Sequence, residues 1–226
     1  MSLFQLDIRL NEIKRKIPQC YSLADIGSDH AYIPISALLE GVAQKAYITD
    51  INQGPLENSR YNAKKYKVDH KCEFLLGGGL EVLKDNVCDV IVISGMGAET
   101  ISEILSQGAI QAEKAGLIIM QPMTQPEILR KFLCENSYFI TEESIVKDAH
   151  LFYQIISARS AYMPCNNYIS DLDYEFSPML IANKDKTMYE FLIYKLKTFE
   201  KILKSLPVNN ISDRRPVSYT HLYRNK

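Results

Sequence analysis

The sequence has few of the features that mark metal sites, disulfide scaffolds or membrane proteins. Its five cysteines are odd in number and form no C-x-x-C pair, and its four histidines are scattered along the chain. We therefore expect neither a structural disulfide nor a metal site. No apolar run approaches the roughly eighteen residues of a membrane span, and acidic residues lie where a signal peptide would be apolar. These absences predict a reduced, cytoplasmic protein without a membrane partner.

The chain also lacks a strong excess of either charge. Its formal net charge is −1 over 226 residues, so a nucleic acid would have to be bound by a local basic face. The composition, with 46% hydrophobic and 23% charged residues, is that of a globular protein. The length suffices for one α/β core and an appendage.

Strand and helix patterns alternate along the first 160 residues. Apolar runs predict strands at 21–26, 46–51, 72–76, 89–94 and 117–120. Helical patterns cover 3–17 and begin near Pro55, Ala98 and Pro126. Two strands in succession, at 138–141 and 152–157, follow. This order predicts an α/β fold with a Rossmann-like sheet that is mostly parallel and ends in an antiparallel strand.

The pattern changes beyond Ser160. A linker leads to residues 168–176, and residues 178–206 predict a long helix whose apolar stripe is edged by lysines. Such a stripe needs a partner, which indicates a helical, coiled-coil-like appendage. We expect a cofactor-binding domain at 1–160 and the appendage at 161–211. Residues 212–226 are interpreted as a non-native or disordered tail that replaces a missing C-terminus, because 217–222 resembles a translated sequencing adapter.

The most informative motif, DIGSDHAY at residues 25–32, lies where the first strand ends and a helix begins. A turn of this kind presents backbone N–H groups to a nucleotide-like ligand. Asp25 and Asp29 flank Gly27, and two carboxylates would repel a pyrophosphate but suit a ligand with an ammonium and a sulfonium group, such as S-adenosylmethionine. The alternative is an ordinary turn in which Asp29 caps the following helix.

Three further strand ends should meet this motif, because the carboxyl ends of parallel strands converge on one cleft. Asp50 is placed to accept hydrogen bonds from a ribose diol, although it could instead cap the next helix. The glycines at 77–79 would let an adenine ring approach the backbone, or simply form a turn. Met96 could contact a cofactor or a base, or fill the core.

In this order, the motifs DIGSDHAY, ITDINQGPL, GGGLEVL, GMG and IIMQP resemble those of the bacterial tRNA adenine-N1 methyltransferases that act at tRNA position 22. The resemblance spans about residues 6–206. It implies a class I methyltransferase domain that uses S-adenosylmethionine and a coiled-coil domain that helps to hold tRNA. We also expect a monomer that binds neither DNA nor a metal. The chain departs from the family pattern at Gly78, Ala98 and Met123, where aspartate, glycine and asparagine are usual.

The resemblance and the strand ends together assign roles to residues. Catalysis is expected from Asp29, which would accept a hydrogen bond from the adenine amino group, and from His30. The expected cofactor-binding residues are Asp25, Gly27, Ser28, Asp50, Ile51, Gly77, Gly78, Gly79, Ser94, Gly95 and Met96. The expected substrate-binding residues are Arg9, Tyr32, Gly97, Gln121 and Pro122. Further candidates for RNA contacts are Lys14, Arg15, Lys16, Arg130, Lys131 and the lysines of the appendage.

Two other functions share these features. A class I methyltransferase acting on a small molecule or a protein would have the same cofactor site without needing tRNA. A cofactor- and RNA-binding protein with little turnover is the second, because Gly78 removes an expected carboxylate. A dinucleotide-dependent oxidoreductase is disfavoured by the absence of G-x-G-x-x-G after the first strand.

Overall fold

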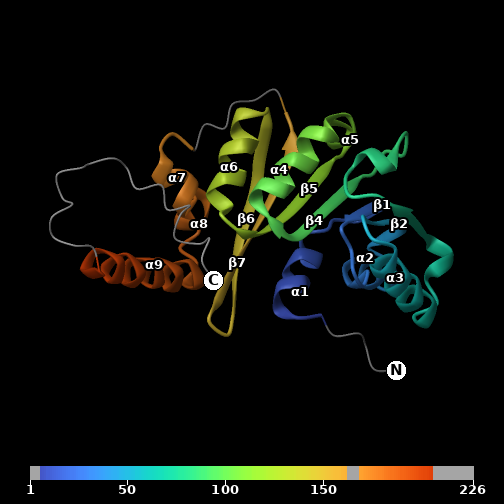
Figure 1. Ribbon diagram of the computed structural model, residues 1–226, viewed down its shortest axis with the longest axis horizontal. Coiled ribbons are helices and arrows are strands. Elements are labelled where there is room, and N and C mark those ends of the chain that lie inside the picture. The colour runs from blue at the N-terminus through green and yellow to red at the C-terminus, as the bar shows by residue number, and fades with distance from the viewer. Residues whose placement is uncertain (1–5, 162–167, 206–226) are drawn as a thin grey trace. The chain divides into compact units, whose positions relative to one another are not determined.

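The computed structural model describes residues 6–161 and 168–205, and within them the chain forms one seven-stranded sheet flanked by helices (Figure 1). The strands are β1 (Cys20–Ile26), β2 (Ala43–Asp50), β3 (Cys72–Leu76), β4 (Val90–Gly97), β5 (Leu117–Thr124), β6 (Tyr138–Asp148) and β7 (Leu151–Ser160). Their spatial order is β3-β2-β1-β4-β5-β7-β6. The first five run parallel, and β7 is antiparallel to both β5 and β6. The expected Rossmann-like methyltransferase sheet is confirmed.

Helices cover both faces of the sheet. The helices are α1 (Ile8–Arg15), α2 (Tyr32–Leu39), α3 (Gln53–Lys65), α4 (Ala98–Gln107), α5 (Ala109–Lys114), α6 (Pro126–Glu135), α7 (Asp171–Phe176), α8 (Pro178–Ala182) and α9 (Lys186–Ser205), with 3₁₀ turns at Asp69–Lys71 and Glu81–Leu83. The core cluster on one face includes residues of α4, α5 and α6, and the cluster on the other face includes residues of α1, α2 and α3.

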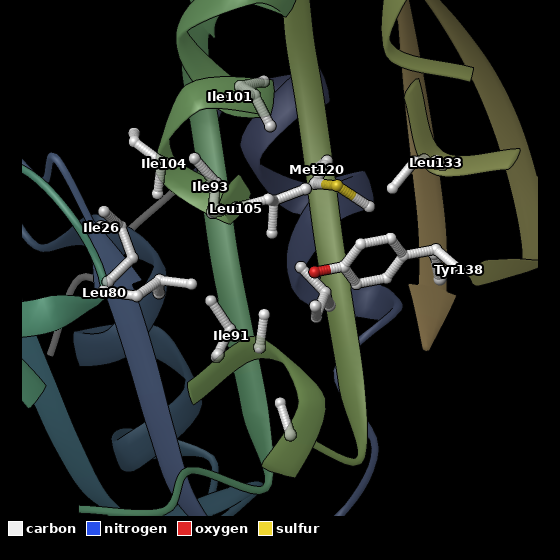
Figure 2. Close-up of a cluster of buried hydrophobic side chains, with 14 of the residues drawn as sticks. Ile26, Leu80, Ile91, Ile93, Ile101, Ile104, Leu105, Met120, Leu133 and Tyr138 are labelled. Carbon is white, nitrogen blue, oxygen red and sulfur yellow. The ribbon is translucent and has the colours of Figure 1, made fainter. Parts of the chain in front are cut away.

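Alternation along β4 explains why this strand holds the two layers together. Ile91 and Ile93 are completely buried in the cluster beneath α4, beside Met120 of β5 (Figure 2). Val90 and Val92 point to the opposite face and join the cluster of α1 and α2. A strand with both faces buried is apolar at nearly every position. The continuous apolar run is the pattern from which this strand was predicted.

The last two strands are longer than the sequence predicted. Apolar runs suggested 138–141 and 152–157, but β6 and β7 pair from Tyr138 with Ser160 to Asp148 with Leu151. The additional residues of β6 alternate between buried and exposed positions and include charged side chains. Cross-strand hydrogen bonds extend the hairpin through residues that carry little apolar signal.

The long helix expected at 178–206 is interrupted. α8 ends at Ala182 and α9 begins at Lys186. The carboxylate of Asp185 accepts hydrogen bonds from the N–H groups of Thr187 (2.6 Å) and Met188 (3.1 Å), so it starts a new helix. Lys184, with φ of +51°, provides the break between the two helices.

The chain divides into two compact units, Met1–Met188 and Tyr189–Lys226. The sequence analysis began the appendage earlier, at residue 161. In the described part of the second unit, Tyr194, Leu196 and Leu203 are exposed, and the Lys195 ammonium lies over the rings of Phe191 and Phe199, 5.5 and 5.9 Å from their centroids. The linker at 162–167 and the predicted tail at 212–226 lie outside the described residues.

A buried ion pair explains why α7 and α8 belong to the sheet unit. Arg130 of α6 is fully buried, and its Nε donates to Glu143 of β6 at 2.6 Å. Its Nη1 donates to the Tyr174 carbonyl at 2.7 Å, which attaches α7. The other Glu143 oxygen accepts from the hydroxyl groups of Tyr168 and Ser177, so the segment before α8 is attached as well. Burial and the Glu143 charge together raise the pKa of Tyr168, which keeps this hydroxyl a donor.

Two sequence-based expectations fail in this region. Arg130 was a candidate RNA contact, but its complete burial in the ion pair removes it from the surface. The expectation of no structural disulfide is also wrong, because Cys134 of α6 is disulfide-bonded. No other cysteine lies within three residues of Cys134, so a search for C-x-x-C pairs cannot find this bond. Cys20, Cys72 and Cys88 are free thiols, as expected.

The buried ion pair leads to a stability prediction. Arg130→Met leaves Glu143 charged and unpaired in the core, so we expect the free energy of unfolding to fall by about 3–5 kcal/mol. Lys131→Met changes the adjacent, exposed residue and should shift it by less than about 0.5 kcal/mol. Thermal or denaturant unfolding followed by circular dichroism measures both. Equal effects of the two substitutions would contradict the role given to Arg130.

Candidate active site

The candidate site lies where the strand order reverses. From β1 the chain winds outward through β2 and β3, then returns to the other side of β1 for β4 and β5. Crevices for ligands form at this switch point, outside the carboxyl ends of the strands. A cavity of about 220 Å³ lies there, lined by Arg9, Leu10, Asp25, Gly27, Ser28, Asp29, His30, Ala31, Tyr32, Ile33, Ser94 and Gly95.

The turn after β1 is built around Ser28. Its N–H donates to the Thr49 carbonyl of β2 (2.8 Å), and its carbonyl accepts from the buried Ser59 hydroxyl of α3 (2.9 Å). Its hydroxyl accepts from the N–H of Ala31 (3.1 Å), the residue that precedes α2. Helix capping by Asp29 is therefore wrong as an alternative, since the Asp29 side chain makes no bond to the start of α2.

Gly27 meets a conformational and a steric requirement. Its φ of +72° is strained for any residue with a side chain. A Cβ atom at this position would lie 2.0 Å from the terminal methyl carbon, Cε, of Met96. Met96 therefore packs against the turn from the end of β4, and it is also in contact with the core cluster under α4.

Asp25 is the buried carboxyl group of the cavity. Its side chain is buried at the end of β1, and burial raises its pKa to about 7, against a smaller lowering by the Ser28 hydrogen bond. No basic side chain of the described residues forms an ion pair with it. A buried carboxylate without a cation is unfavourable in the charged form, and an ammonium group of a ligand would supply the missing partner.

Asp29, His30 and Tyr32 also line the cavity, with Asp29 and His30 exposed and Tyr32 partly buried. The Asp29 carboxylate accepts from Asn58 Nδ2 at 3.3 Å and lies 3.2 Å from His30 Nε2. The His30 and Tyr32 rings stack with centroids 5.0 Å apart and planes 17° from parallel. Two rings and an accessible carboxylate at one opening provide both a stacking surface and a hydrogen-bond acceptor for a base.

The ends of β2 and β3 form a second surface next to this cavity. Asp50 is mostly buried, its Oδ1 accepts from the Asn52 N–H at 2.8 Å, and its carbonyl accepts from the Gly77 N–H at 2.8 Å. Because Asn52 itself precedes α3, Asp50 does not cap that helix. A Cβ atom at Gly78 would lie 3.3 Å from Ile51 Cδ1, and Ile51 is 70% exposed. Gly78 therefore packs closely against Ile51, whose exposed apolar side chain lies at the ends of β2 and β3.

The ends of β4 and β5 bring Arg9 into the site. β4 has a bulge at Gly95, with φ of +81°, between the pairs Ser94 with Gln121 and Met96 with Pro122. Arg9 Nη1 donates to Gln121 Oε1 at 2.8 Å and lies near Gly95. Gln121 and Pro122 are buried and do not line the cavity, and Gly97 lies beside Thr124 where α4 begins.

Three polar residues of α3 and one aromatic residue of β7 belong to the site but were not predicted from the sequence. Asn58, Ser59 and Asn62 hold the turn after β1, with Asn62 donating to the His30 carbonyl at 3.1 Å. Their spacing of three and four residues puts them on one helix face. This spacing could have predicted a shared polar face from the sequence. Tyr153 lies beneath the Arg9 guanidinium, 5.7 Å from its ring centroid, and nothing in the local sequence distinguishes it.

Within the described ranges, no group of three or more potential ligands could hold a metal ion. The same ranges include no helix with the length and apolarity needed to cross a membrane.

Comparison with known proteins gives a consistent answer. The family model TrmK, tRNA (adenine(22)-N(1))-methyltransferase, matches residues 23–224. The Bacillus subtilis (strain 168) tRNA (adenine(22)-N(1))-methyltransferase is 31% identical over 160 residues, which are 71% of this chain and 67% of that protein. A Streptococcus pneumoniae protein described as a candidate tRNA (m1A22) methyltransferase has a TM-score of 0.86 at 27% identity, covering 93% of both chains.

A structure with a bound nucleoside is also similar. TrmK of M. capricolum, in complex with S-adenosylhomocysteine, has a TM-score of 0.80 at 30% identity, covering 92% of this chain and 91% of that one. Taken with the switch-point cavity and the family model, these similarities show that the chain belongs to the tRNA (adenine(22)-N(1))-methyltransferase family.

Proposed function

We propose that this protein transfers a methyl group from S-adenosylmethionine to N1 of the adenine at position 22 of tRNA. Family membership supports the reaction. One observation of the structure supports its location: the buried Asp25 carboxylate at the switch point, which forms no ion pair with any basic side chain of the described residues. We further propose that the protein acts as a cytoplasmic monomer without a metal ion, since methyl transfer from a sulfonium needs none.

The residues present fit such a cofactor. Asp25 would receive the ammonium group, Asp50 would receive the ribose hydroxyls, and the surface of Ile51 and Gly78 would face the adenine. The rest of the cofactor would be enclosed by Ser28, Gly77, Gly79, Ser94 and Met96. Gly78 stands where the family usually has aspartate, so an adenine amino group would need a backbone carbonyl or water as its acceptor.

The reaction is an in-line displacement. The cofactor supplies a methyl group on a sulfonium, and the bond from carbon to sulfur breaks as the N1 lone pair forms the new bond, leaving a neutral thioether and a cationic base. The enzyme therefore has to orient an exposed N1 edge more than to move a proton. In folded tRNA this edge is stacked or paired, so the base must be extruded into the cleft.

Asp29 is the residue we assign to the developing charge. Its accessible carboxylate would accept a hydrogen bond from the adenine amino group and stabilise the cation formed on methylation. His30 and Tyr32 would stack against the extruded base, as their parallel rings already stack on each other. Gly97 would approach this base pocket from the end of β4, whereas the buried Pro122 would support it from β5 without touching the base.

The proposed function is tested by analysing the product. The protein is incubated with S-adenosylmethionine and an unmodified tRNA that has adenine at position 22, or with the same transcript carrying guanine there. Digestion and mass spectrometry should find 1-methyladenosine in the first tRNA only. Methylation of both transcripts, or of neither while the cofactor still binds, would contradict the proposal.

Replacement of Asp29 tests the catalytic assignment. Asp29→Ala should lower kcat by at least about 100-fold and leave the dissociation constant of S-adenosylhomocysteine within about twofold. Glu57→Ala, which removes a nearby exposed carboxylate of α3, is the matched control and should keep normal turnover. A kcat that is unchanged in Asp29→Ala would remove Asp29 from the mechanism.

Asp25 leads to a pH prediction. Because its folded-state pKa is about 7, well above the ordinary value of 3.8, the native state keeps a proton that the unfolded state loses, and stability falls as pH rises through this window. An ammonium ligand needs the ionised form, so cofactor affinity should fall by about tenfold per pH unit below pH 7. Asp25→Asn should bind weakly, with little pH dependence, and should be the more stable protein near pH 8.

Calorimetric titration with S-adenosylhomocysteine between about pH 5.5 and 7.5, where the ligand amine stays protonated, measures this dependence. Affinity of the unaltered protein that does not change across this range would show that Asp25 is not the ammonium partner.

A further inference from the structure

The Arg9 guanidinium is held on two sides by residues from distant parts of the chain. Arg9 is the second residue of α1, whose start is fixed by the Asp7 carboxylate accepting from the Leu10 N–H at 2.7 Å. Its Nη1 donates to Gln121 of β5 at 2.8 Å, and Tyr153 of β7 lies against the planar group, with 5.7 Å between the guanidinium carbon and the ring centroid. A long, flexible side chain is thereby restricted to one place.

Gln121 is suited to this task because it is completely buried and its side-chain amide is fully used. Its Oε1 faces the guanidinium, which can only donate. Its Nε2 donates to the Pro122 carbonyl at 2.9 Å and approaches the Met123 sulfur at 3.5 Å. The acceptor for Arg9 is therefore fixed in position before any ligand arrives.

The register of the sheet brings Tyr153 to the active-site edge. Ile156 of β7 pairs with Met120 of β5, and the strands are antiparallel, so three residues back along β7 and three forward along β5 put Tyr153 level with Met123. The β6–β7 hairpin thus continues past the carboxyl end of β5, beside α1, as Figure 1 shows. Arg9 lies between this hairpin and the bulge at Gly95.

The charges around the cavity divide into two groups. Asp25 and Asp29 are suited to a cationic ligand, whereas Arg9 forms no ion pair with any carboxylate of the described residues. One of its five N–H groups is used by Gln121, and the others can bind an acceptor. The cofactor's reacting end is cationic, so the anion that completes this site has to come with the substrate. In tRNA that anion is a phosphodiester.

We propose that Gln121 and Tyr153 are positioning residues that hold the Arg9 guanidinium at the rim of the cavity, where it binds a backbone phosphate next to the extruded adenosine. This inference rests on the proposed function, because it takes tRNA as the substrate. It changes the expected role of Gln121 from substrate contact to orientation of Arg9.

Equilibrium binding of the tRNA transcript in the presence of S-adenosylhomocysteine, followed by fluorescence anisotropy, tests the inference. Arg9→Ala should weaken tRNA binding by about tenfold and reduce the salt slope of log affinity by about one. Tyr153→Leu should weaken it by about threefold, and Tyr153→Phe, which keeps the ring, should recover most of that loss. Affinity for S-adenosylhomocysteine alone should be unchanged in all three.

Two further variants separate positioning from a structural role. Gln121→Glu keeps the acceptor for Arg9 but pairs the guanidinium charge with a carboxylate, so it should weaken tRNA binding. Its second oxygen faces the Pro122 carbonyl and lowers stability, so the control readout is the affinity for S-adenosylhomocysteine, which should be unchanged. Adding Tyr153→Leu to Arg9→Ala should produce no further loss, because Tyr153 acts through Arg9. Phe152→Leu, on the neighbouring residue with its own cation–π partner Lys147, is the control and should bind tRNA normally.

The outcomes distinguish this inference from the proposed function. Normal tRNA binding by Arg9→Ala, or additive losses in the double variant, would overturn the inference while methylation of adenine 22 by the unaltered protein still stands. Absence of that methylation would overturn the proposed function, and specific tRNA binding that depends on Arg9 would then still support the phosphate contact.

Discussion

The site depends on one buried carboxylate. Asp25 lies at the carboxyl end of β1, the strand next to the point where the sheet order reverses, and burial raises its pKa to about 7. A charge in this position destabilises the protein unless a cation joins it. The turn after β1 is arranged around this requirement: Gly27 adopts a left-handed conformation, and Ser28 is tied to β2 and α3 by its backbone. Asp25 can therefore bind a cationic group, which the ligand has to supply.

Arg9, which lines the same cavity, has the complementary charge. Arg9 lies next to the bulge at Gly95 and donates a hydrogen bond to Gln121, and no carboxylate of the described residues forms an ion pair with it. In our proposal a cationic cofactor enters beside Asp25 and an anionic RNA backbone beside Arg9, with the base between them. The two ligands would then be held by residues of opposite charge in one cavity, which favours one orientation of the methyl donor and the acceptor base.

Much of this could be predicted from the sequence, because the relevant signals are local. Strands β1 to β5 are apolar runs, and the DIGSDHAY turn is contiguous, so both were identified before the structure. The failures involve contacts that sequence does not encode locally. Arg130 looks like a surface cation until Glu143, thirteen residues later, and Tyr168 are brought to it. The sequence predicts one helix across residues 183–185, but the Asp185 carboxylate caps a new helix there and interrupts the predicted one. Tyr153 reaches the site only through the register of β7 against β5.

The most direct test of the account is a structure of the protein with bound S-adenosylhomocysteine. The account predicts that the ligand lies across the ends of β1, β2 and β4, with its ammonium within about 3 Å of the Asp25 carboxylate, its ribose on Asp50 and its adenine against Ile51 and Gly78. A ligand bound in this cleft with its ammonium turned away from Asp25, or bound elsewhere on the sheet, would contradict the account.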